Sequence, residues 1–588
     1  MIRFKPSNAA DVPNPPAGYV TLFVDDATGQ PSTKSEGGAV VSLKGADGEA
    51  GEGVPEGGEP GQVFAKTESG AAWVDAPYTG AGADNSAQGV FAIVAGGKNN
   101  GAFADYAGIS SGENNIAASA HAFVGGGKGN TNTGEHAVIA GGKGNNLSTP
   151  FSVIGGGENN GNHAPHSFVG GGESNLASNE THATVCGGKQ NSATRAYTFV
   201  GGGESNQATS SHAFIGGGKS NAATDAHSVA VGGEGNTSSG SHAFSGGGSG
   251  CNAEGIYSVA VGGQNSVANS AHSVVVGGAG NSAGAEYVFI GGGQSNGGSG
   301  AHAVVAGGEN CSANGPHAAV LGGKGNQATS PFTAVSGGQN NGAHASHAAV
   351  LGGENNIAGA EHAAILGGKG NYATNPFTAV SGGQNNGAHA SHAAVLGGED
   401  NLAVAEHAAA LGGKGNMATA PASWVVGLDA KATITGSGAR ASGKFAQRGD
   451  AQSTSVILLG TSDSADVVTL AQGAATEPES NQRLGLVSGC AVLRGVVLAR
   501  DAASGDSAAW EVTALVHRGA LSSSAAIVGA PAVTVIGKSP GAADWGVALV
   551  IAHSASGAYL DVQVTGAAAQ NIRWMLDVSA FTTLGDSA

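Results

Sequence analysis

Charged residues, aromatic residues and cysteines are all scarce in this chain. Charged residues make up 11% and aromatic residues 5% of its 588 residues, well below the usage of ordinary globular proteins. The net charge is −18, from 24 basic and 42 acidic residues, which argues against a nucleic-acid partner because such binding depends on clustered Lys and Arg. No disulfide framework is expected, because paired spacing is missing among the four cysteines: Cys186, Cys251, Cys311 and Cys490.

Long apolar segments are also missing. No run of 18 apolar residues occurs, and the N-terminal sequence MIRFKPSNAADVPNPPAGYV lacks the continuous apolar stretch of a signal peptide. These absences predict a soluble protein that is made in the cytoplasm and does not insert into a membrane. At 588 residues the chain is too long for one hydrophobic core, so several domains or a repeat array are expected.

Glycine, by contrast, is abundant, with 106 residues, and much of it belongs to a repeat of 15 residues. A typical unit is HAFVGGGKGNTNTGE, in which a short apolar strand is followed by a glycine pair and then an asparagine. The period predicts an all-β, parallel β-roll or β-solenoid over residues 86–426. One inserted residue interrupts the column of aromatic residues and histidines that opens each repeat: Phe91, Tyr106, His121, His136, Phe151, His166, His182, Tyr197, His212, His227, His242, Tyr257, His272, Tyr287, His302, His317, Phe332, His347, His362, Phe377, His392 and His407.

The glycine pair and the asparagine of each unit are expected to be structural. Gly141 and Gly142 suit a tight corner that excludes side chains, so replacing either with valine should impair assembly. Asparagines such as Asn130 and Asn145 tolerate left-handed backbone and can hydrogen-bond along the axis of the array. Lys and Glu share the position after the glycine pair, which predicts an exposed charge ladder of small energetic value.

The histidine column has competing interpretations. Stacking or interface packing is favoured for His121, His136 and His166, because Tyr and Phe share the column and a phenyl ring cannot ligate a metal. Metal binding and pH sensing are the alternatives, although an HxxH pair such as His163/His166 would point to opposite faces of a strand. GGxGN is similar to the calcium-binding GGxGxD repeat but lacks its aspartate and its period. No metal or cofactor is therefore expected.

Adjacent apolar residues in each strand point to self-association. At Phe123 and Val124, for example, both strand faces are apolar, so both are expected to be buried. A single-chain solenoid needs only its inner face buried, so the second face implies another copy of the chain. The Gly-X-Y triplets of residues 45–51 would tolerate three chains running together. At one strand spacing of about 4.8 Å per turn, the array predicts a rod of roughly 105 Å.

The regions around the repeat suggest separate domains. Residues 1–44 have a compact β-type pattern, residues 45–85 form a spacer, and residues 427–452 lose the 15-residue period and are expected to be a transition. Residues 453–588 alternate short apolar runs with turn signals, which predicts a C-terminal β-sandwich or jelly-roll-like domain.

Several segments resemble known proteins. PPAGYVTLFVDDATGQ, the Gly-X-Y spacer and GGEPGQVFAKTESGAAWV resemble the virion-proximal parts of bacteriophage tail fibres. HAFVGGGKGN and HAAVLGGENNIAGAE resemble the left-handed β-roll of trimeric autotransporter adhesin heads, and GKFAQRGDAQ, SAAWEVTALVHRG and NIRWMLDVSAF are similar to C-terminal domains of phage tail proteins. The resemblance implies a homotrimeric tail fibre in the virion, assembled in the host cytoplasm. Its N-terminus would attach to a tail or baseplate protein, and its C-terminus would face a host glycan or outer-membrane receptor.

No catalytic activity is expected. A tailspike-like glycan depolymerase is an alternative that requires closely set carboxylates, whereas the terminal acids lie in or beside apparent loops: Asp463, Asp466, Glu477 and Glu479. A purely structural spacer or virion decoration protein is a further alternative. Receptor contact is assigned to residues 453–588, which offer non-repeating loops. Four aromatic residues there are candidates to stack on sugars, with core packing as the alternative: Trp510, Trp545, Tyr559 and Trp574.

Overall fold

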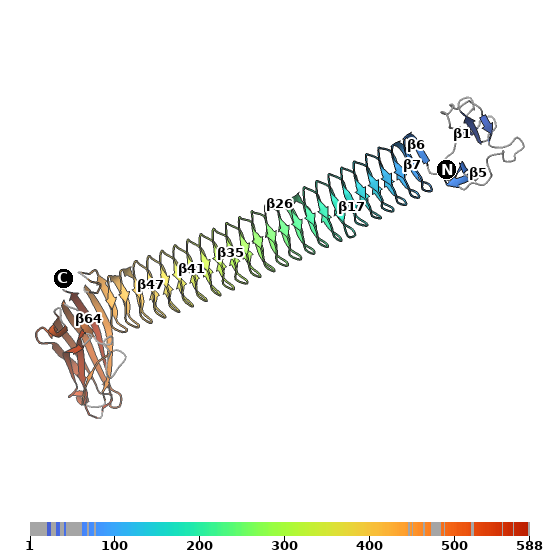
Figure 1. The fold of residues 1–588 in the computed structure, drawn as a ribbon. Coiled ribbons are helices and arrows are strands. Elements are labelled where there is room, and N and C mark those ends of the chain that lie inside the picture. Colours follow the sequence, from blue (N-terminus) through green and yellow to red (C-terminus); the bar gives the residue numbers. More distant parts are fainter. Residues whose placement is uncertain are drawn as a thin grey trace. The chain divides into compact units, whose positions relative to one another are not determined.

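The computed structural model describes residues 20–24, 31–35, 40–42, 62–67, 70–75, 78–444, 447–449, 451–462, 465–471, 484–486, 489–518, 522–554, 557–568 and 570–585. Within these ranges every regular element is a strand except two three-residue 3-10 helices, Ser522–Ser524 and Pro540–Ala542. The all-β prediction is therefore confirmed. No helix in the described part of the chain is long and apolar enough to cross a membrane. The chain divides into two compact units, Met1–Ser238 and Ser239–Ala588. Figure 1 shows short strands stacked side by side along much of each unit.

The first unit begins with two small antiparallel sheets. Strands β1 (Val20–Val24), β2 (Pro31–Ser35) and β3 (Val40–Ser42) form a meander, in which Leu22 faces Thr33. Strands β4 (Gln62–Thr67) and β5 (Gly70–Asp75) form a hairpin. The Gly-X-Y stretch at residues 45–51 lies outside the described residues.

A parallel β-solenoid follows these sheets, and its turns match the 15-residue period. It starts before residue 86, because β6 (Tyr78–Ala83) pairs in parallel with β8 (Ile93–Lys98). Each turn then contributes one strand to each of two parallel ladders. In the first ladder, Phe123 pairs with Val138 and Val138 pairs with Val153. The second ladder contains 24 strands in all, from β7 (Ser86–Ala87) to β53 (Lys431–Ala432). The predicted parallel solenoid is confirmed.

The interior of each turn is narrow and apolar. Val124 and Ile139 of the first ladder and Leu147 of the second are fully buried, and small alanines fill the remaining space between the ladders. Side chains alternate along a strand, so the residue before each buried one points outward. Phe123 is accordingly 41% exposed. A single chain therefore buries only the inner face, and the expected burial of the outer face by another copy of the chain stays a prediction.

In the second unit the same two ladders continue past the expected boundary at residue 426. Strand β52 (Trp424–Leu428) pairs in parallel with β54 (Gly438–Ser442), and β53 lies between them in sequence. Residues 427–442 are therefore solenoid rather than a transition. Trp424 pairs with Gly438, a step of 14 residues instead of the 15 between Ala409 and Trp424. This one-residue shortening hides the final turn from the sequence period.

The solenoid passes directly into a β-sandwich, because β54 also pairs in antiparallel fashion with β55. One sheet follows the order β55, β64, β58, β59 and β61, with β60 also on β59, and the other places β63 beside β56, β57 and β62. Buried residues from both sheets form one core, which confirms the sandwich prediction. The strand bounds are β55 Ala451–Ser462, β56 Val467–Thr469, β57 Leu484–Leu486, β58 Gly489–Asp501, β59 Ser507–Arg518, β60 Ala526–Ile527, β61 Ala532–Lys538, β62 Gly546–Ser554, β63 Gly557–Thr565 and β64 Ile572–Gly585.

Candidate functional site

The asparagine column is a buried hydrogen-bond ladder along the solenoid. The backbone N–H of Asn145 donates to Asn130 Oδ1 at 3.0 Å, and Asn145 Nδ2 donates to the carbonyl oxygens of Gly141 and Gly157 at 2.9 and 3.0 Å. Both asparagines are fully buried. The predicted hydrogen bonding along the axis is confirmed. The left-handed backbone, however, belongs to the preceding residue, as at Gly144 with φ of 64°, so this part of the expectation is corrected.

At the corner formed by Gly141 and Gly142, the two glycines have different roles. Gly142 has φ of 96°, and a Cβ placed on it would lie 2.2 Å from the carbonyl oxygen of Gly157 in the next turn. Gly141 has no such restriction, because the nearest atom to an added Cβ is the carbonyl oxygen of Gly126 at 3.9 Å. The geometry therefore supports the expected effect of valine at Gly142 and gives no corresponding clash of an added Cβ at Gly141, and the effect of either substitution on assembly stays a prediction.

Within each unit, the column of aromatic residues and histidines forms a stack of exposed rings. His121 and His136 have ring centroids 4.4 Å apart and an interplanar angle of 8°, and Phe151 and His166 have centroids 5.0 Å apart. The stacking interpretation is thus confirmed. His163 stands apart from this column, and its Nδ1 lies 2.7 Å from Ser148 Oγ. The backbone at each column residue is left-handed, and the signal for this in the sequence is that no β-branched residue occurs in the column.

The predicted charge ladder is present beside the glycine corners. Lys143 Nζ lies 2.7 Å from Glu158 Oε1, and Lys128 Nζ lies 3.1 Å from Glu113 Oε2. The hydrogen bond and charge of Glu158 raise the pKa of Lys143. All four side chains are exposed, so each pair contributes little to stability.

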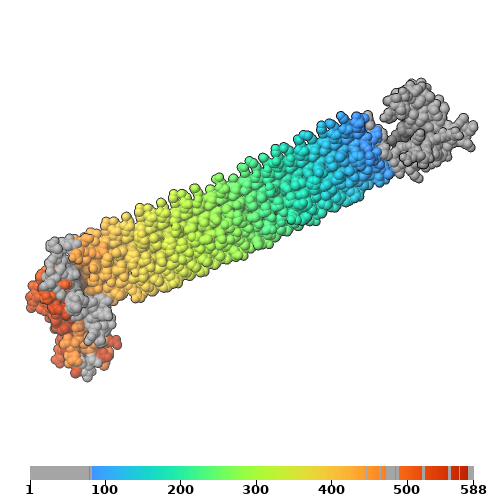
Figure 2. Space-filling model, viewed as in Figure 1, coloured from blue at the N-terminus to red at the C-terminus, as the bar shows by residue number. Residues whose placement is uncertain are grey.

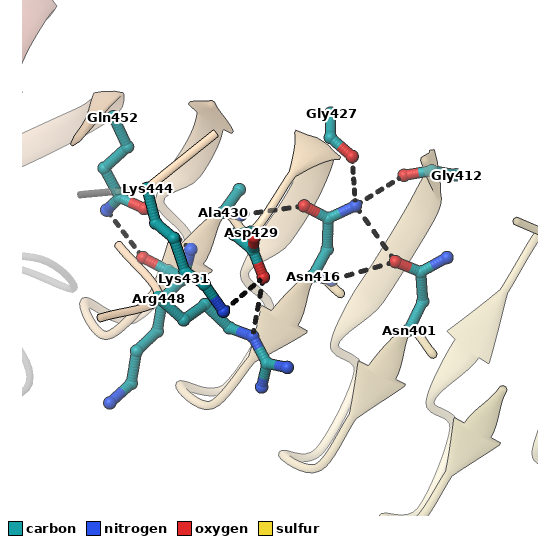
Figure 3. A network of polar contacts seen from close by, with 10 residues as sticks. All are labelled: Asn401, Gly412, Asn416, Gly427, Asp429, Ala430, Lys431, Lys444, Arg448 and Gln452. Carbon is teal, nitrogen blue, oxygen red and sulfur yellow. Dashed lines mark hydrogen bonds and ion pairs between the residues drawn. The ribbon is translucent and has the colours of Figure 1, made fainter. Parts of the chain in front are cut away.

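A polar network closes the distal end of the solenoid (Figure 3). The asparagine ladder ends where Asn416 Oδ1 accepts the N–H of Ala430 at 2.8 Å. The side chain of Gln452 then replaces the missing next strand of the second ladder. Its Oε1 accepts the N–H of Lys431 and its Nε2 donates to the carbonyl oxygen of Lys431, both at 2.6 Å. Asp429 is paired with Lys444 at 3.4 Å. An exposed ladder edge would otherwise be open to pairing with another chain.

The four aromatic candidates of the terminal domain belong to its core. Trp510, Trp545 and Trp574 are 1–2% exposed and Tyr559 is 5% exposed. Trp574 Nε1 donates to Ser462 Oγ at 2.9 Å, and the rings of Trp510 and Trp574 stack with centroids 5.6 Å apart. Burial leaves no ring face available to a sugar. The receptor-contact assignment of these residues is corrected to the alternative, core packing between the two sheets.

A cationic pocket lies on the outer face of the large sheet instead. Its volume is about 620 Å³, and Arg500 and Arg573 contribute its charge. These arginines face each other directly across β58 and β64, an unfavourable arrangement for two like charges. Leu498 and Met575 form the next pair along the same two strands and give the pocket an apolar wall. The sequence alone does not reveal this site, because the two arginines meet only through the pairing of β58 with β64, which are far apart in the chain.

Two carboxylates lie near this pocket. The backbone N–H of Ser504, with its hydroxyl, lowers the pKa of Asp501, and the hydroxyls of Ser539 and Ser504 lower the pKa of Asp506. Both groups are therefore ionised at neutral pH, whereas a glycosidase acid must hold a proton and have a raised pKa. Neither Asp501 nor Asp506 therefore has the raised pKa that a general acid of this kind needs. Three of the acids considered from the sequence lie outside the described residues: Asp463, Glu477 and Glu479.

Comparison with known proteins adds little to this picture. No family model matches the chain, and no curated protein matches it either. Among solved structures, the chain is similar to a tailspike protein of Acinetobacter baumannii phage AM24, with 9% identity over 79% of this chain and 74% of that chain. The TM-score of 0.13 is too low to support a conclusion about fold or function.

Proposed function

We propose that the chain is a non-catalytic bacteriophage tail fibre, a homotrimer in the virion that binds the host surface through residues 453–588. The observation that carries this proposal is the contrast between a solenoid that repeats one surface on every turn and a terminal domain whose described residues form an unrepeated cationic pocket. Figure 2 shows the regular surface of the solenoid. Repetition suits a spacer, whereas specific recognition needs a unique group of side chains on a rigid support. The N-terminal region then attaches to the virion tail or baseplate.

The outward face of the first ladder supports trimerisation. Each outward phenylalanine is followed two residues later by glycine, and a Cβ added to Gly246 would lie 2.8 Å from the ring of Phe244. In later turns alanine stands in place of the phenylalanine, and leucine stands in place of the glycine two residues after it. Such volume compensation is expected of a packed surface. The phenylalanines are Phe123, Phe168, Phe199, Phe214, Phe244 and Phe289, and the leucines that follow alanine are Leu321, Leu351, Leu366, Leu396 and Leu411.

This apolar face predicts the oligomeric state. Leu351 and Leu366 are 53% and 51% exposed in one chain, and an exposed apolar row of this kind is typical of an interaction surface. Because the row follows the chain's own period, another copy of the chain is its simplest partner. Mass photometry of the purified protein should therefore give three times the chain mass of 56.3 kDa. A folded, stable monomer would contradict the proposal.

The pocket of the terminal domain indicates the chemistry of the receptor. An arginine guanidinium binds a carboxylate or phosphate group through two parallel hydrogen bonds, and this pocket holds two arginines. Its aliphatic wall suits the apolar face of a sugar ring. A host glycan that carries acidic groups meets both requirements. Three copies of the pocket would also add avidity, so that modest affinity at each site is sufficient.

The test uses full-length protein in an adsorption-blocking assay with host cells. The wild-type chain should block virion adsorption, and replacing Arg500 and Arg573 with serine should weaken cell binding about tenfold or more, because a hydrogen bond to a charged group contributes roughly 1.5–3 kcal/mol. Arg494→Ser is the matched control, since Arg494 is exposed on the same strand but does not line the pocket.

Two results would support a different function. A wild-type protein that shortens the host polysaccharide would be a tailspike-like depolymerase. A trimer that neither blocks adsorption nor binds cells would be a spacer or virion decoration protein whose receptor-binding partner is another chain.

A further inference from the structure

Two histidines and a glutamate converge at one corner of the distal solenoid. The ligand atoms of His392, Glu406 and His407 all lie within 4.8 Å of one another, and all three side chains are exposed. The imidazole centroids are 4.7 Å apart, and their planes are tilted by 23°. His407 Nε2 lies 3.6 Å from Glu406 Oε1. The 15-residue turn produces this cluster, because it places residues n, n+14 and n+15 at the same corner of successive turns.

The same order of residues occurs twice more in the chain, although among the described residues only His392, Glu406 and His407 have all three ligand atoms within 4.8 Å of one another. His347, Glu361 and His362 repeat it, with stacked imidazoles 4.8 Å apart and His362 Nε2 at 3.6 Å from Glu361 Oε1. In the first unit, His121 and His136 stack at 4.4 Å, and Glu135 lies 3.8 Å from His136 Nε2. These three corners share a feature that ring stacking does not require, which is a carboxylate directly before the second histidine: Glu135, Glu361 and Glu406.

We propose that each of these corners binds one divalent transition-metal ion of the zinc class through two imidazoles of successive turns and the intervening glutamate. Imidazole and carboxylate are ligands suited to Zn²⁺, Ni²⁺ and Cu²⁺. Two ligand atoms on one tetrahedral zinc lie about 3.3 Å apart, given zinc–nitrogen bonds of about 2.0–2.1 Å. The exposed side chains have to turn before their ligand atoms reach this distance, and water completes the coordination.

At one corner a second contact orients the ligand. His392 Nδ1 lies 2.9 Å from Ser391 Oγ, which leaves Nε2 as the nitrogen available to a metal. Hydrogen bonding of the other ring nitrogen is the usual way in which a metal-binding histidine is held in position. The ion would join two successive turns on the outside of the solenoid. Metal binding at these corners does not depend on the proposed adhesive role.

Full-length protein, treated with a chelator and then dialysed, is titrated with Zn²⁺ by isothermal titration calorimetry. Three ions should bind per chain. Replacing His407 with phenylalanine keeps the stack, because Phe377 already stacks on His392 with centroids 5.0 Å apart, but it removes a ligand and should reduce the stoichiometry to two. Glu406→Gln should weaken binding at that corner at least tenfold. Combined replacement of His136, His362 and His407 with phenylalanine should abolish the three sites.

Two controls separate metal chelation from general affinity of the histidine column. His302 and His317 stack with centroids 4.9 Å apart but have Pro316 in place of the glutamate, so His317→Phe should leave the stoichiometry unchanged. Tyr287 follows Glu286 where a second histidine would be needed, so Glu286→Gln should have no effect. Unchanged zinc binding by the triple phenylalanine variant, or an equal loss from His317→Phe, would overturn the proposal. A Glu406→Gln variant with wild-type affinity would overturn the glutamate as a ligand.

Discussion

Replacement of Gly142 with alanine should prevent stable folding of the solenoid at that turn, whereas replacement of the adjacent Gly141 should be tolerated. Positive φ at Gly142 costs an L-residue about 1–3 kcal/mol on its own. The larger effect comes from the carbonyl oxygen of Gly157, which would lie 2.2 Å from the new Cβ and which also accepts the N–H of Lys143 at 2.8 Å. Relieving the clash separates two turns and breaks this hydrogen bond.

The two alanine variants form a matched pair of neighbouring residues with the same change in side-chain volume. We expect Gly142→Ala to lose most of its soluble assembled protein, or to unfold at a much lower temperature than wild type. Gly141→Ala should match wild type in yield and in thermal unfolding, because the nearest atom to its added Cβ is the carbonyl oxygen of Gly126 at 3.9 Å, an ordinary van der Waals distance. Equal behaviour of the two variants would show that the corner has been assigned to the wrong glycine.

The solenoid could be predicted from the sequence because its determinants are local and recur at every turn. Hydrogen bonds join residues 15 apart, as between Asn130 and Asn145, so a fixed period specifies which residues meet. The ring stack was predictable for the same reason. The backbone dihedrals could not be predicted in the same way. Asn145 and Gly144 both tolerate left-handed backbone, and only the structure of the corner shows that Gly144 adopts it.

In the terminal domain, prediction stopped at the strands. The alternation of apolar and polar residues predicted these strands. It did not show which tryptophans face the other sheet, because an apolar strand position is compatible with core packing and with ligand contact. The pairing of Arg500 with Arg573 depends on β58 and β64 being neighbours, and 73 residue positions separate the two arginines. The outer face of the first ladder could not be assigned from the sequence either. Phe123 is partly exposed in a single chain, and its full burial would require a second chain.

The asparagine ladder makes a second strong prediction, which depends on pH. Asn145→Asp is nearly isosteric, but it replaces the Nδ2 donor with an oxygen that faces the carbonyl oxygens of Gly141 and Gly157. Burial and these acceptors disfavour the ionised form, so the introduced carboxyl should have a pKa well above its unfolded value of about 3.9. A pKa raised by about two to three, common for fully buried carboxyls, costs about 3–4 kcal/mol at neutral pH.

The sign of this pH dependence follows from proton binding. Between the unfolded and folded pKa values, the folded variant binds more protons than the unfolded chain, so its stability falls as pH rises through this window. Thermal unfolding should therefore show a large deficit against wild type at pH 7 and a small one at pH 4. Asn159→Asp is the control, because Asn159 is exposed and Asp400 occupies the equivalent position naturally. If both aspartate variants showed the same deficit at both pH values, the buried ladder would not be the cause.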